Sequence, residues 1–146
     1  MPLVRIDMNR GRGSVEVTAV ADAIHDAIVD TYGIPERDRF QIITQHDPGA
    51  IIAQDAGLGF ERSPEVVMIQ IFTQRGRSTK AKQALYARIT ERLGHVGISG
   101  EDVFLGYVEN GPEDWSFGFG MAQYITGEIA VPASQTTTEA ATSPPA

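Results

Sequence analysis

The chain has 146 residues, of which 42% are apolar and 21% charged, and this suffices for one folded domain but not comfortably for two. It contains no cysteine, so disulfides, thiolate catalysis and cysteine-ligated zinc are excluded. A net charge of -7, no apolar run near the ~18 residues of a membrane span, and a first segment unlike a signal peptide predict a cytoplasmic protein without nucleic acid or membrane partners.

The first half of the chain reads as strand, helix and strand. Residues 2–7 alternate in polarity as a strand does, and residues 40–44 predict a second strand. Between them a helix is expected from Ser14, as its N-cap, to a stop at Gly33. His25 falls on the polar side of this helix and is expected to be exposed. The apolar stripe of the helix recurs at steps of three and four, at Val17, Val20, Ala21, Ile24, Ala27 and Ile28.

The second half repeats that order. Residues 66–73 are nearly all apolar, as in a strand buried on both faces, and residues 103–108 predict another strand. A helix between them is expected to be capped by Ser78 or Thr79 and to stop at Gly94. Its expected inward side chains are Ala81, Ala84, Leu85, Ile89 and Leu93.

The remaining segments are less regular. Residues 50–61 predict an irregular or hairpin region, and residues 124–131 predict a short closing strand. Residues 133–146 are rich in Thr, Ala and Pro and contain no large apolar side chain, so we expect a disordered C-terminal tail. The folded domain is then expected to span residues 1–132.

A short repeat supports tandem duplication of one β-α-β unit. Arg10-Gly-Arg12 and Arg75-Gly-Arg77 lie 65 residues apart, each between a predicted strand and a predicted helix. Two such units side by side form an α+β fold, in which a four-stranded sheet carries two helices on one face. The other face then needs a cover, which predicts an oligomer with its sheets facing inward.

Pro2 is the first candidate for catalysis. Removal of Met1 leaves a secondary amine at the N-terminus, and an apolar surrounding lowers the pKa of such an amine because it disfavours the cation. The amine then serves as a general acid or base near neutral pH, or as a nucleophile toward a carbonyl. The alternative is that proline at this position carries no function. The strand that starts directly after Pro2 favours the catalytic interpretation, since it fixes the amine against the sheet.

Arg75 and Arg77 are candidates for binding an anionic substrate. They follow the buried strand of the second half, whose end can lie near Pro2, and a guanidinium there can bind a carboxylate through two hydrogen bonds. The alternative is that both are solvated loop arginines. Arg10 and Arg12, at the equivalent place in the first half, are expected to be solvated.

The other candidates are a carboxylate and a group of aromatic residues. Asp38 can orient a water or hold a protonated amine, or it can simply pair with Arg37 or Arg39. Trp115 and Phe117 belong to a segment dense in aromatic and glycine residues, which suits either a pocket wall or ordinary core and interface packing. The three histidines have no partners at ligand spacing, so we expect no metal site.

Several motifs together resemble the tautomerase superfamily, and within it the malonate semialdehyde decarboxylase group. The likeness runs over residues 2–131. The strings that carry it are Pro2-Leu, Gly33-Ile-Pro-Glu-Arg-Asp-Arg-Phe40, Gly57-Leu-Gly-Phe-Glu-Arg62, Val108-Glu-Asn110, Asp114-Trp-Ser-Phe-Gly118 and Tyr124-Ile-Thr-Gly-Glu128.

The resemblance implies a homotrimer of chains that each contain two β-α-β units. It implies that Pro2 is the catalytic amine, that Asp38 is the assisting carboxylate, and that Trp115 and Phe117 line the pocket. In that family pattern an arginine, a proline and an arginine follow the buried strand. Here the stretch is one residue longer, so either Arg75 or Arg77 can be the residue that binds the substrate, with Arg77 favoured because it directly precedes the helix cap.

The expected activity is cofactor-independent decarboxylation of a small 3-oxo acid, malonate semialdehyde by resemblance, to acetaldehyde and CO2. A first alternative is tautomerisation, or hydration, of a small enol or unsaturated acid in the same pocket. Dehalogenation is disfavoured, because the positions that match the extra catalytic residues of dehalogenase relatives hold Val29 and Trp115. A second alternative is a trimeric binding module of the same fold without catalysis.

Overall fold

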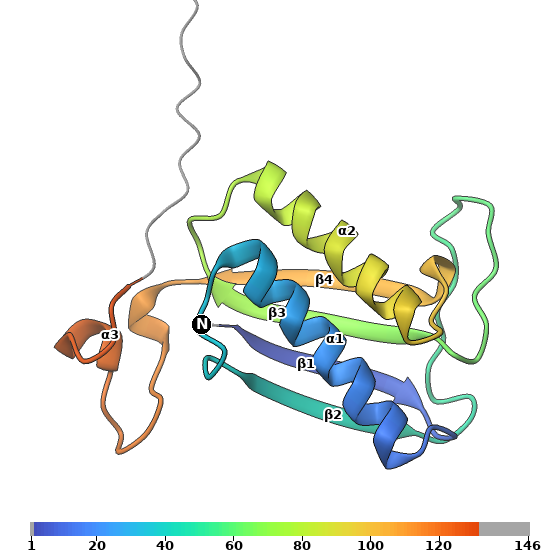
Figure 1. The fold of residues 1–146 in the computed structure, drawn as a ribbon, viewed down its shortest axis with the longest axis horizontal. Coiled ribbons are helices and arrows are strands. Elements are labelled where there is room, and N and C mark those ends of the chain that lie inside the picture. The colour runs from blue at the N-terminus through green and yellow to red at the C-terminus, as the bar shows by residue number, and fades with distance from the viewer. Residues whose placement is uncertain (1, 132–146) are drawn as a thin grey trace, which may run out of the picture.

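Strand β1 (Leu3–Asn9) occupies an inner position in a four-stranded sheet of order β2-β1-β3-β4. It pairs in parallel with β2 (Phe40–His46) and antiparallel with β3 (Val67–Gln74), while β3 pairs in parallel with β4 (Val103–Asn110). Both long helices lie on the same face of this sheet in the computed structural model, which describes residues 2–131 (Figure 1). The predicted α+β fold of two β-α-β units is confirmed. The expectations for residue 132 onward lie outside the described residues.

The antiparallel pairing of the two units decides which loops meet. Leu3 lies opposite Phe72, so the start of β1 lies beside the end of β3. The chain therefore leaves β3 next to the N-terminus, but leaves β1 at the opposite end of the sheet. Figure 1 shows the N-terminus and the segment after β4 at one end, with the long connection between β2 and β3 at the other.

The two helices begin and end by different devices. Helix α1 (Ser14–Tyr32) ends at Gly33, whose φ of +65° lies in the left-handed region that glycine adopts without strain. Helix α2 (Thr79–His95) begins after Ser78, whose side chain accepts a hydrogen bond from the Ala81 N–H at 3.1 Å. The predicted cap by Ser78 is thus confirmed.

Two predicted helix ends are wrong by a residue or two. Ser14 is the first helical residue rather than the cap, because the backbone oxygen of Gly13 already accepts the Val17 N–H at 3.0 Å. Gly94 does not stop α2, which runs on to His95. A lone glycine weakens a helix without breaking it when the preceding turns are anchored in the core.

The core lies in one layer between the helices and the sheet. Every second residue of β1 and β3 points into it, together with the apolar stripes of α1 and α2. The fully or nearly fully buried members are Val4, Ile6, Met8, Ile24, Ile28, Val67, Ile69, Ile71, Leu85, Ile89 and Leu93. The periodicity of three and four, and the alternation of two, thus predicted most of this buried set. The prediction is wrong for Ala84, which is exposed, and Ala81 is only partly buried, so the buried stripe of α2 is limited to Leu85, Ile89 and Leu93.

Truncating Ile69 to alanine is expected to lower the free energy of unfolding by about 2–5 kcal/mol, because the side chain is fully buried and leaves a cavity. Urea denaturation followed by circular dichroism measures the change. The control is Val15→Ala on α1, where the residue is 82% exposed and a change within about 0.5 kcal/mol is expected. Similar losses for the two variants would contradict the assignment of the core.

Two local predictions are wrong for tertiary reasons. His25 is buried rather than exposed, and its Nε2 lies 2.8 Å from the backbone oxygen of Glu36 in the connection after α1. The segment predicted as a closing strand forms instead the one-turn helix α3 (Gln123–Thr126), which ends at Gly127 with φ +87°. The Gly127 N–H bonds back to the Gln123 carbonyl, so the backbone is satisfied locally and not by a neighbouring strand. Short 3-10 turns, η1 (Gly100–Asp102) and η2 (Pro112–Asp114), flank β4.

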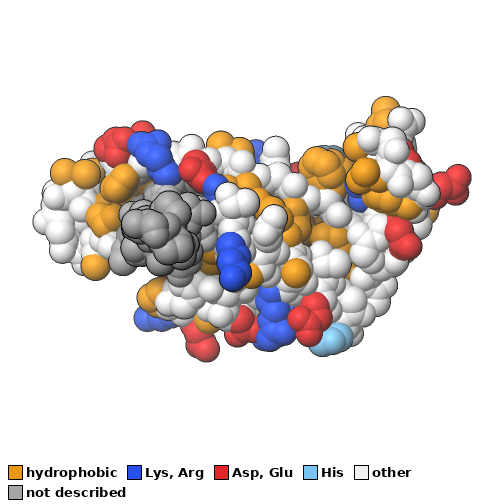
Figure 2. Space-filling model, turned by 90° about the horizontal axis from the view of Figure 1, so that it is seen from above, with side chains coloured by type: hydrophobic (Ala, Val, Ile, Leu, Met, Phe, Trp, Pro, Cys, Tyr) orange, Lys and Arg blue, Asp and Glu red, His pale blue; other side chains and the backbone are white. Residues whose placement is uncertain are grey.

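The sheet face opposite the helices stays uncovered in the single chain. Apolar side chains on this face of the two edge strands each expose between 39% and 47% of their surface: Phe40, Ile42, Phe104 and Val108. On the face seen in Figure 2, Lys and Arg side chains lie among Asp and Glu side chains and form no single basic patch. Within residues 2–131, no helix is both long and apolar enough to cross a membrane.

Candidate active site

Pro2 lies buried at the edge where β1 begins. Leu3, the next residue, pairs with Phe72 near the end of β3. Pro2 therefore lies beside the last residues of β3 and the loop that carries Arg75 and Arg77. The predicted proximity of Pro2 and this arginine loop is therefore present in the sheet register.

Asp38 is buried at this same end, in the turn between α1 and β2. Its backbone N–H donates to the Pro35 carbonyl at 3.0 Å, which holds the turn. Burial raises the pKa of the Asp38 carboxyl, and the positive charges of the amino terminus and of His25 partly oppose this rise. Of the two arginines named as alternative partners, Arg37 and Arg39, the Arg39 guanidinium bonds Asp22 at 2.7 Å.

Asp38→Asn is expected to raise the melting temperature at pH 7 and to leave it unchanged near pH 3. A buried carboxyl whose folded pKa exceeds its unfolded pKa favours folding less as the pH rises through the interval between the two values. Below that interval the Asp38 carboxyl is protonated in both the folded and the unfolded state, so replacing it removes no unfavourable buried charge. Thermal unfolding at the two pH values measures the difference.

Asp55→Asn is the matched control, with the opposite sign. The N–H groups of Gly57 and Gly59 bond the Asp55 carboxylate at 3.0 and 2.7 Å and lower its pKa, so the ionised form stabilises the fold. That contribution is present at pH 7 and is lost as the pH falls through the folded pKa. Asp55→Asn should therefore lower the melting temperature at pH 7 more than at pH 3. The same sign for both variants would contradict the assigned pKa directions.

Arg77 is the better held of the two candidate arginines. Its guanidinium carbon lies 4.2 Å from the centre of the Tyr32 ring, and its Nη1 donates to the Tyr32 backbone oxygen at 3.3 Å. The Tyr32 hydroxyl lies 3.2 Å from that of Tyr107, and burial raises the pKa of both phenols. In contrast, the Arg75 side chain is 61% exposed and its guanidinium lies 3.5 Å from Glu113. The structure thus presents Arg77, rather than Arg75, in a fixed position.

An aromatic wall stands beside these groups. The rings of Trp115 and Phe117 stack with centres 5.8 Å apart and planes 4° apart, and Phe117 also contacts Phe40 at 5.8 Å. The Trp115 indole N–H donates to Asn110 at 2.9 Å, which fixes the ring at the end of β4. Trp115 and Phe117 therefore occupy the same end of the sheet as Pro2.

Tyr124 belongs to the same cluster but was missed as a site residue. Its ring meets Phe117 edge-to-face at 5.3 Å and is buried. Burial, reinforced by the negative charge of Asp38, raises the pKa of Tyr124 to about 12, while the positive charge of Arg77 opposes the shift. The charges of Asp38 and Arg77 therefore both act on the Tyr124 hydroxyl, which stays neutral at physiological pH. Its position shortly after the aromatic segment could have indicated a site residue, but the sequence analysis assigned it to a predicted strand.

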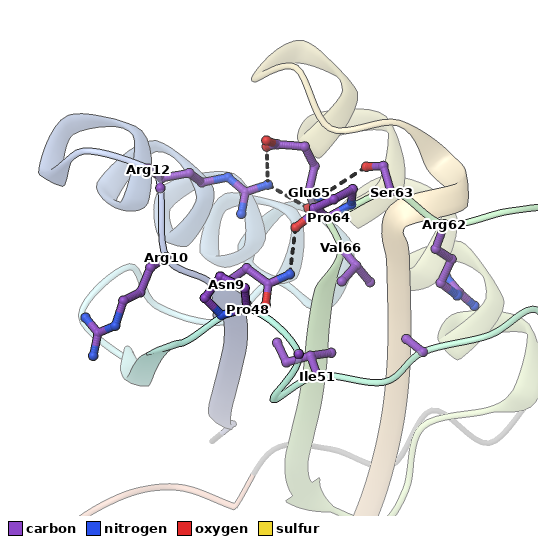
Figure 3. Close-up of a pocket in the computed structure, with 13 residues that line it drawn as sticks. Asn9, Arg10, Arg12, Pro48, Ile51, Arg62, Ser63, Pro64, Glu65 and Val66 are labelled. Carbon is purple, nitrogen blue, oxygen red and sulfur yellow. Dashed lines mark hydrogen bonds and ion pairs between the residues drawn. The ribbon is translucent and has the colours of Figure 1, made fainter.

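The opposite end of the sheet holds a cavity of about 400 Å³, lined in part by Arg10, Arg12 and Arg62 (Figure 3). The expected solvation holds for Arg10 but is wrong for Arg12, whose side chain is only 7% exposed. Arg12 donates to the Glu65 carboxylate at 2.8 Å and to the Glu65 backbone oxygen at 2.6 Å. In the first half of the chain, the arginine equivalent to Arg77 thus binds a carboxylate that the chain itself supplies.

The described residues contain no cluster of three or more His, Cys, Asp or Glu side chains arranged to hold a metal ion. His46 is engaged with Asp7 at 2.6 Å on the uncovered sheet face. The candidate site is built from Pro2, the Asp38 carboxyl, the Arg77 guanidinium and aromatic rings. Such a set suits proton transfer or carbonyl chemistry on a small anion.

The comparisons with known proteins agree with this arrangement. Residues 2–61 and residues 38–118 each match a family described as tautomerase enzyme. The probable tautomerase YrdN of Bacillus subtilis (strain 168) is 37% identical over 130 residues, which cover 88% of this chain and 100% of that protein.

Two solved structures are similar over almost their whole length. A crystal structure of FG41 malonate semialdehyde decarboxylase inhibited by 3-bromopropiolate is 58% identical, with a TM-score of 0.88 over 89% of this chain and 99% of that one. Crystal structures of another malonate semialdehyde decarboxylase, described as a basis for decarboxylase and hydratase activities, are 39% identical, with a TM-score of 0.84 over 87% and 98%. The predicted resemblance is confirmed at the level of the family: with its two β-α-β units and these relatives, the chain is a member of the tautomerase superfamily.

Proposed function

We propose that the protein decarboxylates a small 3-oxo acid, malonate semialdehyde in the first instance, to acetaldehyde and CO2, with the Pro2 amine as the catalytic group. The observation that carries this proposal is the convergence of Pro2, Asp38, Arg77 and the Trp115–Phe117 wall at one end of the sheet. The 58% identity to a malonate semialdehyde decarboxylase supports it.

Arg77 binds the substrate carboxylate in this proposal. A guanidinium held against the Tyr32 ring keeps one direction, so it can orient the breaking C–C bond perpendicular to the carbonyl plane. The aromatic wall excludes water from the departing group. Orientation supplies the larger part of the lowered barrier.

Pro2 acts on the carbonyl at the other end of the substrate. The protonated amine donates a hydrogen bond to the aldehyde oxygen, or the neutral amine attacks the carbonyl carbon and forms an iminium with loss of water. In either route the C–C bond to the carboxylate breaks and its electron pair is delocalised toward the oxygen or the nitrogen. A proton returned to the second carbon completes acetaldehyde, after hydrolysis where an iminium has formed. In this proposal Asp38, buried at the same end of the sheet, favours the protonated amine or positions a water.

Trapping separates the two routes. Borohydride added during turnover reduces an iminium to a stable amine, and mass spectrometry of the N-terminal peptide then finds the added mass on Pro2. The absence of an adduct during active turnover would contradict the iminium route and leave polarisation by the protonated amine.

Tautomerisation or hydration is the second candidate, and the curated Bacillus relatives named probable tautomerases favour it. Tautomerisation needs a largely neutral Pro2, whereas decarboxylation by polarisation needs a protonated one. Incubation with a panel of three-carbon oxo and unsaturated acids, followed by product NMR, compares the reactions directly. CO2 and acetaldehyde as the fastest products support the decarboxylase. Faster ketonisation or hydration would overturn it, and no turnover of any acid would favour a binding module.

We also propose that the chain forms a homotrimer through the sheet face opposite the helices. The exposed apolar side chains of the edge strands, Phe40 and Ile42 on β2 and Phe104 and Val108 on β4, support an inward-facing sheet. Light scattering after gel filtration should give three times the 15.8 kDa mass of one chain. A monomeric mass would contradict the trimer without bearing on the catalytic proposal.

A further inference from the structure

Gln74, the last residue of β3, has a side chain that the described fold does not use. The residue is only 5% exposed, and both Nε2 and Oε1 are shielded from solvent without a hydrogen-bond partner among residues 2–131. Buried amide groups are almost always paired, because an unpaired one keeps the penalty of desolvation without compensation. Such a residue calls for an explanation.

The position of Gln74 places it in the candidate active site. Side chains alternate along a strand, so Gln74 lies on the same sheet face as Phe72 and its partner Leu3, the face opposite the helices. As the last residue of β3 it lies at the end of the sheet where β1 begins, directly before the loop of Arg75 and Arg77. Across the sheet Gln74 is paired with Asn110.

The aromatic wall closes over this part of the sheet. Asn110, the partner of Gln74, accepts the Trp115 indole N–H at 2.9 Å. Phe117 contacts Phe40, which is paired with Leu3 on the same face. Gln74 is therefore buried next to the Trp115–Phe117 wall, at the end of the sheet where β1 begins, and not in the core between the helices and the sheet.

Another buried glutamine at this end of the molecule behaves differently. Gln123 accepts the Phe117 backbone N–H through Oε1 at 2.9 Å and donates through Nε2 to the Gly118 carbonyl at 2.8 Å. Both the oxygen and the nitrogen of the Gln123 amide therefore hold the backbone of the loop at Phe117 and Gly118. Gln74 has the same side chain and similar burial but no such partners within the described part of the chain, which points to a ligand as its missing partner.

We propose that the Gln74 amide binds the oxygen on the third carbon of the substrate acid, while Arg77 binds the carboxylate. Nε2 donates to the carbonyl oxygen, and Oε1 accepts from the hydroxyl when that carbon is hydrated or enolised. The assignment rests on the proposed function, since it gives each end of a 3-oxo acid its own partner. As CO2 leaves, the carbonyl oxygen gains negative charge, so the donated hydrogen bond strengthens toward the transition state.

The neutral amide also defines the substrate class. A second cation at this position would favour dicarboxylates, whereas an amide matches a neutral carbonyl or hydroxyl oxygen. The site is thus suited to monocarboxylates that carry one neutral oxygen on the third carbon.

A binding experiment tests this assignment without turnover. The parent protein is titrated by NMR with 3-hydroxypropanoate and with propanoate, which lacks the oxygen. We expect about 5–10-fold tighter binding of the hydroxy acid, as one hydrogen bond provides, and a ratio near one in Gln74→Met. A parent that does not distinguish the two acids, or a variant that keeps the parent's ratio, would overturn the assignment.

Stability distinguishes ligand binding from a structural role. Gln74→Met keeps the approximate shape of the side chain and removes two unpaired polar atoms, so the melting temperature should stay level or rise by about 2–4 °C. Gln123→Met is the matched control, and its melting temperature should fall because two hydrogen bonds are lost. A comparable fall for Gln74→Met would assign it a structural role and overturn the proposal.

Kinetics complete the test and keep the two proposals separable. For malonate semialdehyde, Gln74→Met should lower kcat about 10–100-fold with a smaller change in KM, because the bond strengthens in the transition state. If the parent does not decarboxylate 3-oxo acids but the binding ratio responds to Gln74→Met, the proposed function fails and the Gln74 assignment stands. If the parent is active and Gln74→Met is equally active, the Gln74 assignment fails and the proposed function stands.

Discussion

Blocking the Pro2 amine is expected to reduce decarboxylation of a 3-oxo acid by about 10²–10⁴-fold. A serine inserted between Met1 and Pro2 leaves a Ser-Pro amide after removal of Met1. The nitrogen of that amide carries no proton and is not basic, so it can neither polarise the carbonyl nor form an iminium. Pro2→Ala is expected to lose less, because a primary amine remains, although without the ring that β1 holds in place.

The measurement is kcat with malonate semialdehyde, with the processed N-terminus verified by intact mass. Pro48→Ala, at the exposed loop on the opposite end of the sheet, is the matched control and should leave kcat unchanged. Unchanged turnover in the serine insertion would contradict a catalytic role for Pro2. A normal melting temperature of the serine insertion would exclude misfolding as the reason for its lost turnover.

Arg77→Ala is expected to lower kcat/KM by about 10²–10³-fold, because the substrate carboxylate loses its cation in a partly desolvated site. Since the guanidinium also packs on Tyr32, a second variant, Arg77→Met, keeps much of the stem and separates packing from charge. Arg77→Lys should recover part of the activity, as a lysine supplies charge without the planar fork.

Arg75→Ala is the matched control, taken from the same loop. Its side chain is largely exposed and its contact with Glu113 spans 3.5 Å, so it should change kcat/KM by no more than about 3-fold. A larger loss for Arg75→Ala than for Arg77→Ala would reverse the assignment. The choice between the two arginines was open in the sequence, and these two variants decide it.

The internal duplication provides an independent argument for Arg77. Arg12 occupies the equivalent place in the first unit and binds the Glu65 carboxylate, with its own side chain almost completely buried. Among the described residues, Arg77 contacts the Tyr32 ring and backbone and no carboxylate. In the first unit the chain itself thus supplies a carboxylate to the arginine, whereas among the described residues of the second unit the equivalent arginine contacts Tyr32 and no carboxylate.

Much of the fold was predictable because local patterns and tertiary structure agree. The alternation of β1, the steps of three and four in α1 and the apolar run of β3 all describe residues that face one core. The repeated Arg-Gly-Arg string and the repeated element order predicted two β-α-β units. Local patterns were misleading where the tertiary context decides. His25 is buried by the chain that follows α1, and α3 replaces a predicted strand with local hydrogen bonds such as that from the Gly127 N–H to the Gln123 carbonyl.

The sequence by itself therefore determined the duplicated α+β unit, the buried stripe of each element and the presence of a proline able to become the terminal amine. The tertiary structure decided which of the two Arg-Gly-Arg loops, residues 10–12 or residues 75–77, lies next to Pro2. Because β1 and β3 are antiparallel, the loop after β3 lies at the start of β1, while the loop after β1 lies at the far end of the sheet. There the Glu65 carboxylate accepts a hydrogen bond from Arg12. The direction of strand pairing and the burial of side chains arise from contacts between residues distant in the chain, so a local sequence pattern does not predict them.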